Sequence, residues 1–326
     1  MTDIARAVWF LKQGRLVAFP TETVYGLGAD ATNPRAIDLI YRTKGRPSTN
    51  PLIIHVADVE RAKRYTVDWP VNAAELAARF WPGPLTIVLG KRGLIPDSAT
   101  AGLQTVALRV PDHALALELL RAFDGPLAAP SANRSTRVSS TTAGHVRDEF
   151  PDSAAAGGAA ENEPALILDG GECMVGIEST VLDLTTATPT ILRPGQITAE
   201  DLRRIIGAVQ LGPTVRDQST PVPSPGQQEI HYAPRTAAYR FEASQRDGLP
   251  GHDIGVIALG SLGDRKPSAR AIALPNDPAQ YAQRLYSVLR ELDELGLTAL
   301  YIEMPPDLPR WAGIRDRLMR ATRPLS

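Results

Sequence analysis

KGRPSTNPLIIHV, residues 44–56, joins a basic turn to an apolar segment of β-strand character. Before it, residues 36–42 have helical spacing of apolar side chains, and after it residues 52–56 form a short β-branched run that contains His55. Farther along, the apolar residues 127–129 lead into the turn Pro-Ser-Ala-Asn at residues 130–133. This sequence of helix, basic turn and strand predicts an α/β fold with polar loops at the ends of its strands.

The two loops carry groups suited to a polyphosphate. Lys44 and Arg46 are cations one residue apart, and Ser131 and Asn133 offer a hydroxyl and a carboxamide. Charge-assisted bonds from the cations would neutralise a polyphosphate, while the neutral groups would orient it. No G-x-x-x-x-G-K-[ST] phosphate loop occurs in the chain.

Composition limits the class of protein. The chain has 326 residues, 43% of them apolar and 22% charged, with a formal net charge of −1. Such a chain is long enough for two globular domains, and its balanced charge argues against a general affinity for nucleic acid. One cysteine, Cys173, excludes an internal disulfide and a cysteine-rich metal site. No usable signal peptide and no run of ~18 apolar residues are visible, so we expect a cytoplasmic protein without a membrane partner.

Further elements follow from the apolar patterns. We expect helices at 4–12, within 58–80, at 114–123 and from Thr198 onward, and strands at 16–19, 85–89, 105–110, 165–168, 180–184 and 190–192. Residues 153–160 are of low complexity and are expected to form a surface loop.

The second half of the chain changes character at residues 207–235, which contain several prolines and few large aliphatic residues. This composition predicts an extended linker without a core of its own. Beyond it, we expect strands at 254–259, 271–274 and 298–302, a helix whose apolar stripe runs from Tyr281 to Leu295, and a closing helix at 311–319. Alternating strands and helices predict a small parallel, Rossmann-like α/β domain, although no G-x-G-x-x-G marks a dinucleotide site.

Other motifs accompany the first two in a fixed order: PTETVYGLG at 20–28, WPGPLT at 81–86, VALRVP at 106–111 and GIEST at 176–180. Together these motifs resemble the threonylcarbamoyl-adenylate synthase family, whose core is the YrdC-type domain. The resemblance is dense over residues 1–206, and SPG at 224–226 and HYAP at 231–234 resemble the linker of the long, two-domain form. It implies a YrdC-like twisted mixed sheet with flanking helices at 1–206, a linker or lid at 207–235, and the Rossmann-like α/β domain at 236–326.

The resemblance also implies a reaction. Members of the family join L-threonine, bicarbonate (or CO2) and ATP into threonylcarbamoyl-adenylate and release pyrophosphate. This product serves the modification of adenosine 37 in tRNAs that read codons beginning with A, and a downstream threonylcarbamoyl transferase machinery consumes it. We expect Mg²⁺ to be held mainly by the ATP phosphates, and therefore treat Asp169, Glu172 and Glu178 as solvated loop acids.

Family roles can be carried onto the matching positions of this chain. The threonine contacts correspond to Thr23, His55, Arg109 and Ser179, together with the backbone near Ala129. The nucleotide contacts correspond to Arg46, Asn50, Thr105, Ser131, Ser139 and Arg193. Lys44, Arg46, Ser131 and Asn133 form the implied catalytic cluster, and Tyr232 of the linker is an implied lid over the nucleotide.

Two other functions remain open from the sequence. The first is a carbamoyl transferase of the hydrogenase-maturation type, although one cysteine cannot supply the zinc fingers that such enzymes carry. The second is an RNA-binding module that grips a backbone with a basic groove formed by Arg42, Lys44, Arg46, Arg134 and Arg137, without stable DNA binding. The closing helix reads GIRDR at 313–317 where family members tend to carry an Asn-Arg pair, which leaves the role of that helix and of residues 236–326 open.

Overall fold

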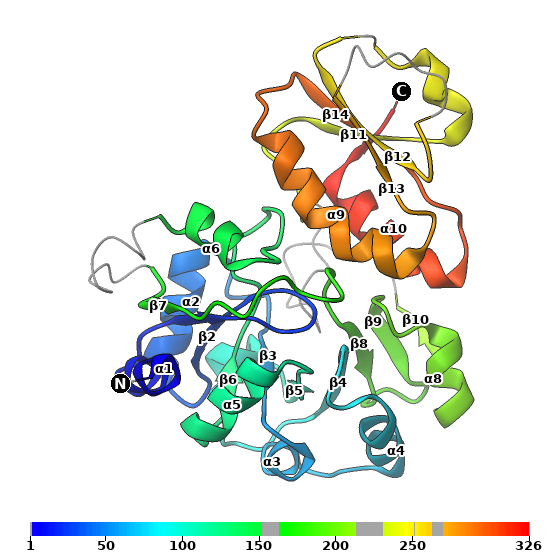
Figure 1. The fold of residues 1–326 in the computed structure, drawn as a ribbon. Helices are drawn as coiled ribbons and strands as arrows, with labels where there is room; N and C mark the ends of the chain where they lie inside the picture. The colour runs from blue at the N-terminus through cyan, green and yellow to red at the C-terminus, as the bar shows by residue number, and fades with distance from the viewer. Residues whose placement is uncertain (1, 152–162, 213–230, 251, 263–269, 326) are drawn as a thin grey trace.

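The computed structural model describes residues 2–151, 163–212, 231–250, 252–262 and 270–325. Two β-sheets organise these residues (Figure 1), a large one in the first two thirds of the chain and a smaller one near the C-terminus. The smaller sheet lies above the larger one in this view, and helices α9 and α10 lie between them. This architecture confirms the predicted α/β class.

The larger sheet is mixed, as predicted. Its described strands follow the order β10-β9-β8-β4-β5-β3-β6-β2-β1-β7. It contains both parallel pairs, such as β3 with β5, and antiparallel pairs, such as β4 with β5. The strands are β1 (Val17–Phe19), β2 (Gly26–Asp30), β3 (Ile53–His55), β4 (Leu85–Gly90), β5 (Thr105–Arg109), β6 (Leu127–Ala128), β7 (Leu166–Ile167), β8 (Thr180–Asp183), β9 (Thr190–Arg193) and β10 (Gln210–Leu211).

Helices with polar N-caps flank this sheet. Asn33 caps α2 and Thr198 caps α8, in each case by accepting backbone N–H groups of the first turn. Gly45 ends α2 with a φ of 60°, a left-handed conformation that glycine adopts without steric cost. The helices of this domain are α1 (Asp3–Lys12), α2 (Pro34–Lys44), α3 (Val59–Lys63), α4 (Val71–Phe80), α5 (Ala114–Phe123), α6 (Ala143–Glu149) and α8 (Ala199–Ile206), with a 3-10 turn at Asp97–Thr100.

The smaller sheet is parallel throughout, in the order β13-β12-β14-β11-β15. Its strands are β11 (Ala238–Phe241), β12 (Ile254–Leu259), β13 (Arg270–Leu274), β14 (Ala299–Glu303) and β15 (Arg323–Pro324). Helices α9 (Pro278–Asp293) and α10 (Ala312–Ala321) and two 3-10 turns, Ala243–Gly248 and Pro309–Trp311, complete this part of the chain. The predicted Rossmann-like character is therefore confirmed.

Loops of the larger domain and the C-terminal domain share one hydrophobic cluster. Val24, Val138 and Ile177, from loops of the larger domain, belong to the same buried cluster as the apolar stripe of α9 and the inner face of α10. Glycines allow this close contact, because a Cβ on Gly313 of α10 would come within 2.9 Å of the carbonyl oxygen of Gly195. The C-terminal domain is thus packed against the larger domain over part of its core.

Several details differ from the sequence-based expectations. Lys44 is the last residue of α2 and not part of the following turn, because the helix extends until Gly45 stops it. Leu295 lies beyond the end of α9 and is 43% exposed, so the predicted apolar stripe ends at Leu292. The glycine-rich β2 and the short β10, β11 and β15 were not predicted from the sequence. Their sequences carry no clear strand pattern, and pairing with neighbouring strands defines them. The predicted loop at 153–160 and the SPG motif at 224–226 lie outside the described residues.

Candidate functional site

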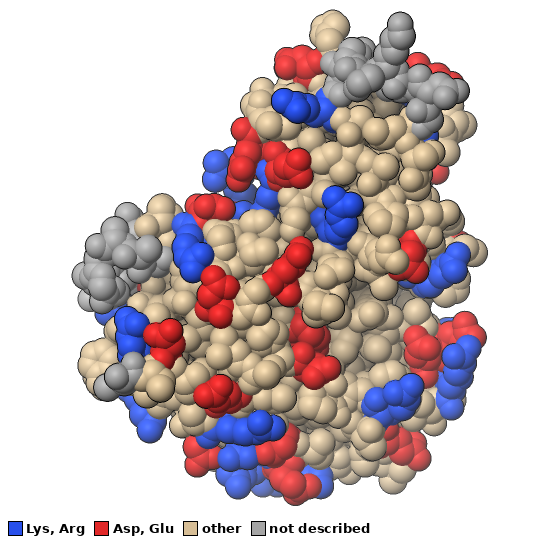
Figure 2. Space-filling model, in the orientation of Figure 1, with Lys and Arg blue, Asp and Glu red and all other residues tan. Residues whose placement is uncertain are grey.

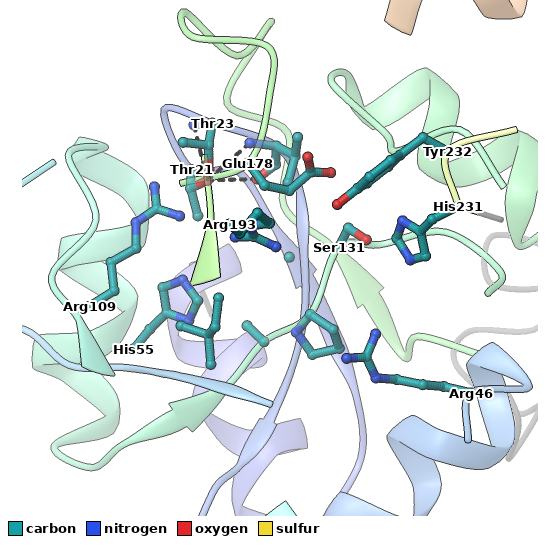
Figure 3. Close-up of a pocket in the computed structure, with 15 residues that line it drawn as sticks. Thr21, Thr23, Arg46, His55, Arg109, Ser131, Glu178, Arg193, His231 and Tyr232 are labelled. Atoms are coloured by element: carbon teal, nitrogen blue, oxygen red, sulfur yellow. Dashed lines mark hydrogen bonds between the residues drawn. The ribbon is translucent and has the colours of Figure 1, made fainter. Parts of the chain in front are cut away.

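A small buried cavity lies over one face of the larger sheet (Figure 3), where motifs distant in sequence meet. Its volume is about 40 Å³, enough for only a few water molecules. Eight of the predicted site residues line it: Thr23, Arg46, His55, Arg109, Ala129, Ser131, Arg193 and Tyr232. The other predicted residues do not: Lys44, Asn50, Thr105, Asn133, Ser139 and Ser179.

His55 and Arg109 lie side by side at one end of the cavity because β3 and β5 are parallel neighbours in register. Burial, followed by the nearby Arg109 guanidinium, lowers the pKa of His55 to about 3, so the imidazole is neutral at pH 7. Arg109 donates its Nε–H to the carbonyl oxygen of Gly83 at 3.2 Å, and its Nη2 lies 2.7 Å from Oε2 of Glu22. A neutral ring therefore stands beside a fixed, ion-paired cation.

Two more guanidinium groups enter the cavity from other elements. Arg46 follows α2 and donates its Nε–H and an Nη2–H to the carbonyl oxygens of Asn50 and Pro51. Arg193, at the end of β9, donates to the carbonyl oxygen and to Oγ of Ser179, both at 3.1 Å. Burial lowers the pKa of Arg46 to about 10, which still leaves it charged at pH 7. Arg46 donates these bonds to neutral acceptors, which leave its charge available to an anion, whereas Arg193 also interacts with the Glu178 carboxylate.

Lys44 has a different place from the predicted phosphate clamp. Its Nζ donates to the carbonyl oxygen of Ser131 at 2.7 Å and also to that of Asn133, so it holds the turn after β6 from behind. Asn133 stiffens the same turn, because its Nδ2 donates to the carbonyl oxygens of Arg134 and Arg137. Burial, followed by the proximity of Arg46, lowers the pKa of Lys44 well below its usual value. Lys44 and Asn133 are therefore behind the cavity wall that Ser131 provides.

The remaining predicted residues support the cavity or lie apart from it. Ser179 shares a hydrogen bond of 2.7 Å with Thr86 Oγ1 and holds Arg193. Asn50 is 1% exposed and supplies the carbonyl oxygen that fixes Arg46. Thr105 starts β5, at the opposite end of that strand from Arg109, so it lies along the same sheet face but outside the cavity.

Glu178 corrects one expectation. It was treated as a solvated loop acid, yet it is 7% exposed and lines the cavity. Burial by itself would raise the pKa of Glu178, but the Arg317 and Arg193 guanidinium groups and a hydrogen bond from Ser139 outweigh it and lower this pKa to about 2. Its place within the GIEST motif, next to the predicted Ser179, was the available signal. Asp169 and Glu172 are exposed, as expected.

His231 and Tyr232 close the cavity from the side opposite the sheet (Figure 3). Tyr232 is 1% exposed, has a left-handed φ of 61°, and its hydroxyl has no hydrogen-bond partner among the described residues. The next residue, Ala233, donates its N–H to the carbonyl oxygen of Thr136 at 2.8 Å. His231 and Tyr232 of the HYAP motif therefore form a wall of the site, which the composition of the linker did not show.

The arrangement is well suited to anionic substrates with a carboxylate and phosphates. Three buried guanidinium groups face the cavity, and Glu178 is the single carboxylate among its lining residues. No group of three or more His, Cys, Asp or Glu side chains with metal-binding spacing occurs among the described residues. Both Glu178 oxygens are already hydrogen-bonded, so this cavity offers no free carboxylate ligand from the described part of the chain.

Comparisons with known proteins identify the family of this chain. A family model described as "Telomere recombination", which covers Sua5, YciO and YrdC proteins, matches residues 9–195. A second model, described as "Threonylcarbamoyl-AMP synthase, C-terminal domain", matches residues 197–322. An α/β fold with a cation-lined cavity, in a chain matched by both models, defines an enzyme of the Sua5/YrdC class.

Relatives of similar length identify the family within this class of enzymes. A threonylcarbamoyl-AMP synthase of Pyrococcus abyssi is 38% identical over 97% of this chain and 93% of its own length. One of Bacillus subtilis is 40% identical over 98% of this chain and 92% of its own. The crystal structure of P. abyssi Sua5 complexed with L-threonine superposes with a TM-score of 0.87 at 35% identity, covering 100% of this chain and 97% of that one. The chain belongs to the threonylcarbamoyl-AMP synthase family.

Proposed function

We propose that this chain joins L-threonine, bicarbonate (or CO2) and ATP into threonylcarbamoyl-adenylate and releases pyrophosphate. The observation that carries the proposal is the convergence of Arg46, Arg109 and Arg193 on one buried cavity, in a chain of this family. The product is the activated intermediate for the threonylcarbamoylation of adenosine 37 in tRNAs that read codons beginning with A. A threonylcarbamoyl transferase machinery takes it up in the next step.

At the threonine end, Arg109 binds the substrate carboxylate. Its Nε is fixed on Gly83 and its Nη2 on Glu22, so the guanidinium is oriented before the substrate arrives. Thr23 and the neutral imidazole of His55 orient the hydroxyl and the amine, with the backbone at Ala129 completing the pocket. Because His55 is neutral, it places no positive charge beside the substrate amine. The lone pair of the amine therefore stays available as the nucleophile.

At the nucleotide end, Arg46 and Arg193 stabilise the charge that builds on the phosphoryl oxygens as the carbamate attacks the α-phosphorus and pyrophosphate leaves. Ser131 orients a phosphate from the turn that Lys44 and Asn133 hold in place. Ser139 and Ser179 act indirectly, on Glu178 and Arg193 respectively. Mg²⁺ enters with ATP, bound mainly by phosphate oxygens and water.

An apolar surface beside the cavity fits the rest of the nucleotide. Ile53, which lines the cavity, belongs to a buried cluster on the same face of the sheet with Val88, Ala107, Val181 and Leu192. Side chains on alternate residues of β5 share this face, so Thr105 lies at its far end. The adenosine lies on this surface, and Asn50 and Thr105 mark its borders.

The domain organisation follows the same logic. Residues 1–206 carry the catalytic site, residues 207–235 form a linker whose last part serves as a lid, and residues 236–326 form the second domain. The larger sheet continues into the linker, because β10 (Gln210–Leu211) pairs with β9. The cavity of about 40 Å³ offers room for a few water molecules, which is too little for ATP. His231 and Tyr232 therefore move when substrates enter, and close over them before the reaction.

The RNA-binding alternative loses its main support. Lys44 and Arg46 are 3% and 8% exposed, so they cannot contribute to an open basic groove. The face of the molecule in Figure 2 shows cationic and anionic side chains interspersed.

Among the described residues, no helix combines the length and apolar character required to cross a membrane.

The decisive experiment measures pyrophosphate release by the purified full-length chain. We expect release from Mg-ATP only when both L-threonine and bicarbonate are present, together with formation of threonylcarbamoyl-adenylate. Pyrophosphate release that is independent of threonine, or salt-sensitive RNA binding without turnover, would contradict the proposal.

A further inference from the structure

A cation of the C-terminal domain reaches the wall of the candidate site. Arg317, on α10, is 1% exposed, although 139 positions separate it in sequence from Glu178. Its Nε donates to Glu178 Oε2 at 2.8 Å, and its Nη1 donates to the carbonyl oxygen of Pro194 at 2.9 Å. It therefore contacts the residue two positions before β8 and the residue after β9, which lie at the same end of this antiparallel pair as Arg193.

Glu178 depends on the C-terminal domain for its orientation. Oε1 accepts a hydrogen bond from Ser139 Oγ at 2.6 Å, within the larger domain. Oε2 accepts from Arg317 and from the hydroxyl of Tyr286 on α9, the latter at 3.0 Å. Asp316 holds Arg317 from the other side at 2.9 Å, so the guanidinium has little freedom. Two of the three bonds to this carboxylate thus come from α9 and α10.

The ring of Tyr232 is held by the same two residues. The Cζ atom of Arg317 lies 5.1 Å from the ring centroid, a cation–π distance. Tyr286 stacks on the ring with centroids 5.9 Å apart and an interplanar angle of 23°. The backbone N–H of His231 donates to the carbonyl oxygen of Arg320 on α10 at 3.2 Å. The wall opposite the sheet is therefore held in place largely by α9 and α10.

We propose that Arg317 is a positioning residue for catalysis, which fixes Glu178 and Tyr232 and thereby couples the packing of the C-terminal domain to closure of the substrate cavity. The kinetic part of this inference rests on the proposed function. This proposal gives a role to α10, because that helix supplies the cation that lies behind the cavity wall on the nucleotide side. Arg317 does not line the cavity itself and acts through its two neighbours.

The test compares Arg317→Met, Arg317→Lys and the control Arg315→Met in the full-length chain. Arg315 is on the same helix but pairs with Asp307, away from the cavity. We expect Arg317→Met to raise the apparent KM for ATP about tenfold or more, with a smaller change in the KM for threonine. Arg317→Lys should restore part of the loss, since it keeps the charge near Tyr232, and Arg315→Met should match the wild type.

A second readout does not need turnover. Amide hydrogen exchange at Ala233, whose N–H is bonded to Thr136, should be about tenfold faster in Arg317→Met than in the control. The same increase is expected for Gly313→Ala, which keeps every charge but places a methyl group against Gly195. This variant also decides the matter if Arg317→Met does not fold.

The outcomes separate the two proposals. A wild-type chain without threonine-dependent pyrophosphate release would refute the proposed function, while the exchange measurements would still test the coupling. Unchanged exchange at Ala233 in both Arg317→Met and Gly313→Ala would overturn the coupling. An unchanged KM for ATP in a folded Arg317→Met variant would also overturn it, because Arg317 would then serve stability alone.

Discussion

At the scale of single residues, the site is made of buried charges whose roles depend on their partners. Arg46 bonds to neutral carbonyl oxygens, whereas Arg109 is paired with the carboxylate of Glu22 and Arg193 interacts with that of Glu178. A cation held by neutral acceptors retains more attraction for an anion than one already neutralised. We therefore expect Arg46 to contribute most where charge develops, and Arg109 to act mainly in binding and orientation.

This difference predicts distinct kinetic effects for Arg109→Ala and Arg46→Ala. Arg109→Ala should raise the apparent KM for threonine far more than that for ATP. Arg46→Ala should lower kcat by about a hundredfold or more, because it removes a preorganised donor to the phosphoryl group. Steady-state constants for both substrates in both variants are the measurement.

Arg121→Ala is the matched control, since Arg121 is exposed on α5 and should leave all constants unchanged. Equal losses for ATP and threonine in the Arg109 variant would show that the threonine pocket is placed wrongly.

At the scale of elements, helix α2 and the turn at 130–133 form one unit. Lys44, at the helix C-terminus, bridges two carbonyl oxygens of a turn 87 positions farther along the chain. A lysine in this position lies at the C-terminal end of the helix dipole and supplies donors that the buried turn lacks. The rigidity of the turn that presents Ser131 therefore depends on the packing of α2.

Lys44→Met should separate this role from that of a phosphate ligand. Because it leaves buried carbonyl oxygens without a donor, we expect a loss of unfolding free energy of about 1–3 kcal/mol together with a fall in kcat. Urea denaturation and pyrophosphate release measure the two effects. Arg42→Met, at an exposed position of the same last helical turn, should change neither. A pure loss of activity at full stability would instead favour direct contact between Lys44 and ATP.

At the scale of the whole molecule, buried histidines make stability depend on pH. Burial lowers the pKa of His55, His145 and His231 from 6.5 to about 3, about 4 and about 3 respectively. The unfolded chain therefore binds protons at these groups between pH 6.5 and the folded-state values, while the folded chain does not. Stability should be complete above about pH 6.5 and should fall as the pH decreases below it.

We predict a loss of about 2 kcal/mol for each of His55 and His231 between pH 6.5 and pH 5, and a smaller loss for the partly exposed His145. His145 is outside the cavity, so His145→Gln tests this without disturbing the site. The variant should lose less stability than the wild type between pH 7 and pH 5, measured by urea midpoints. His252→Gln, at an exposed position, should follow the wild type. An identical pH dependence in His145→Gln would contradict the assignment.

Much of both domains could be predicted from local patterns. The helix 114–123 and the strands at 85–89 and 254–259 carry strong apolar periodicity, and all three are present. The strand β2 was missed because Gly26 and Gly28 have no strand preference of their own. A Cβ on Gly28 would come within 2.6 Å of the Phe19 ring, so close packing against β1 demands glycine there.

The sequence by itself determined the fold class, the family resemblance and most of the residues that line the cavity, because these depend on local pattern and motif order. Only the tertiary structure decided that Lys44 lies behind the wall, that Glu178 is buried, and that Arg317 reaches the site from the C-terminal domain. The physical reason is that the role of a charged side chain is set by its partners and by its burial. Both depend on contacts between segments far apart in the chain, which no local pattern encodes.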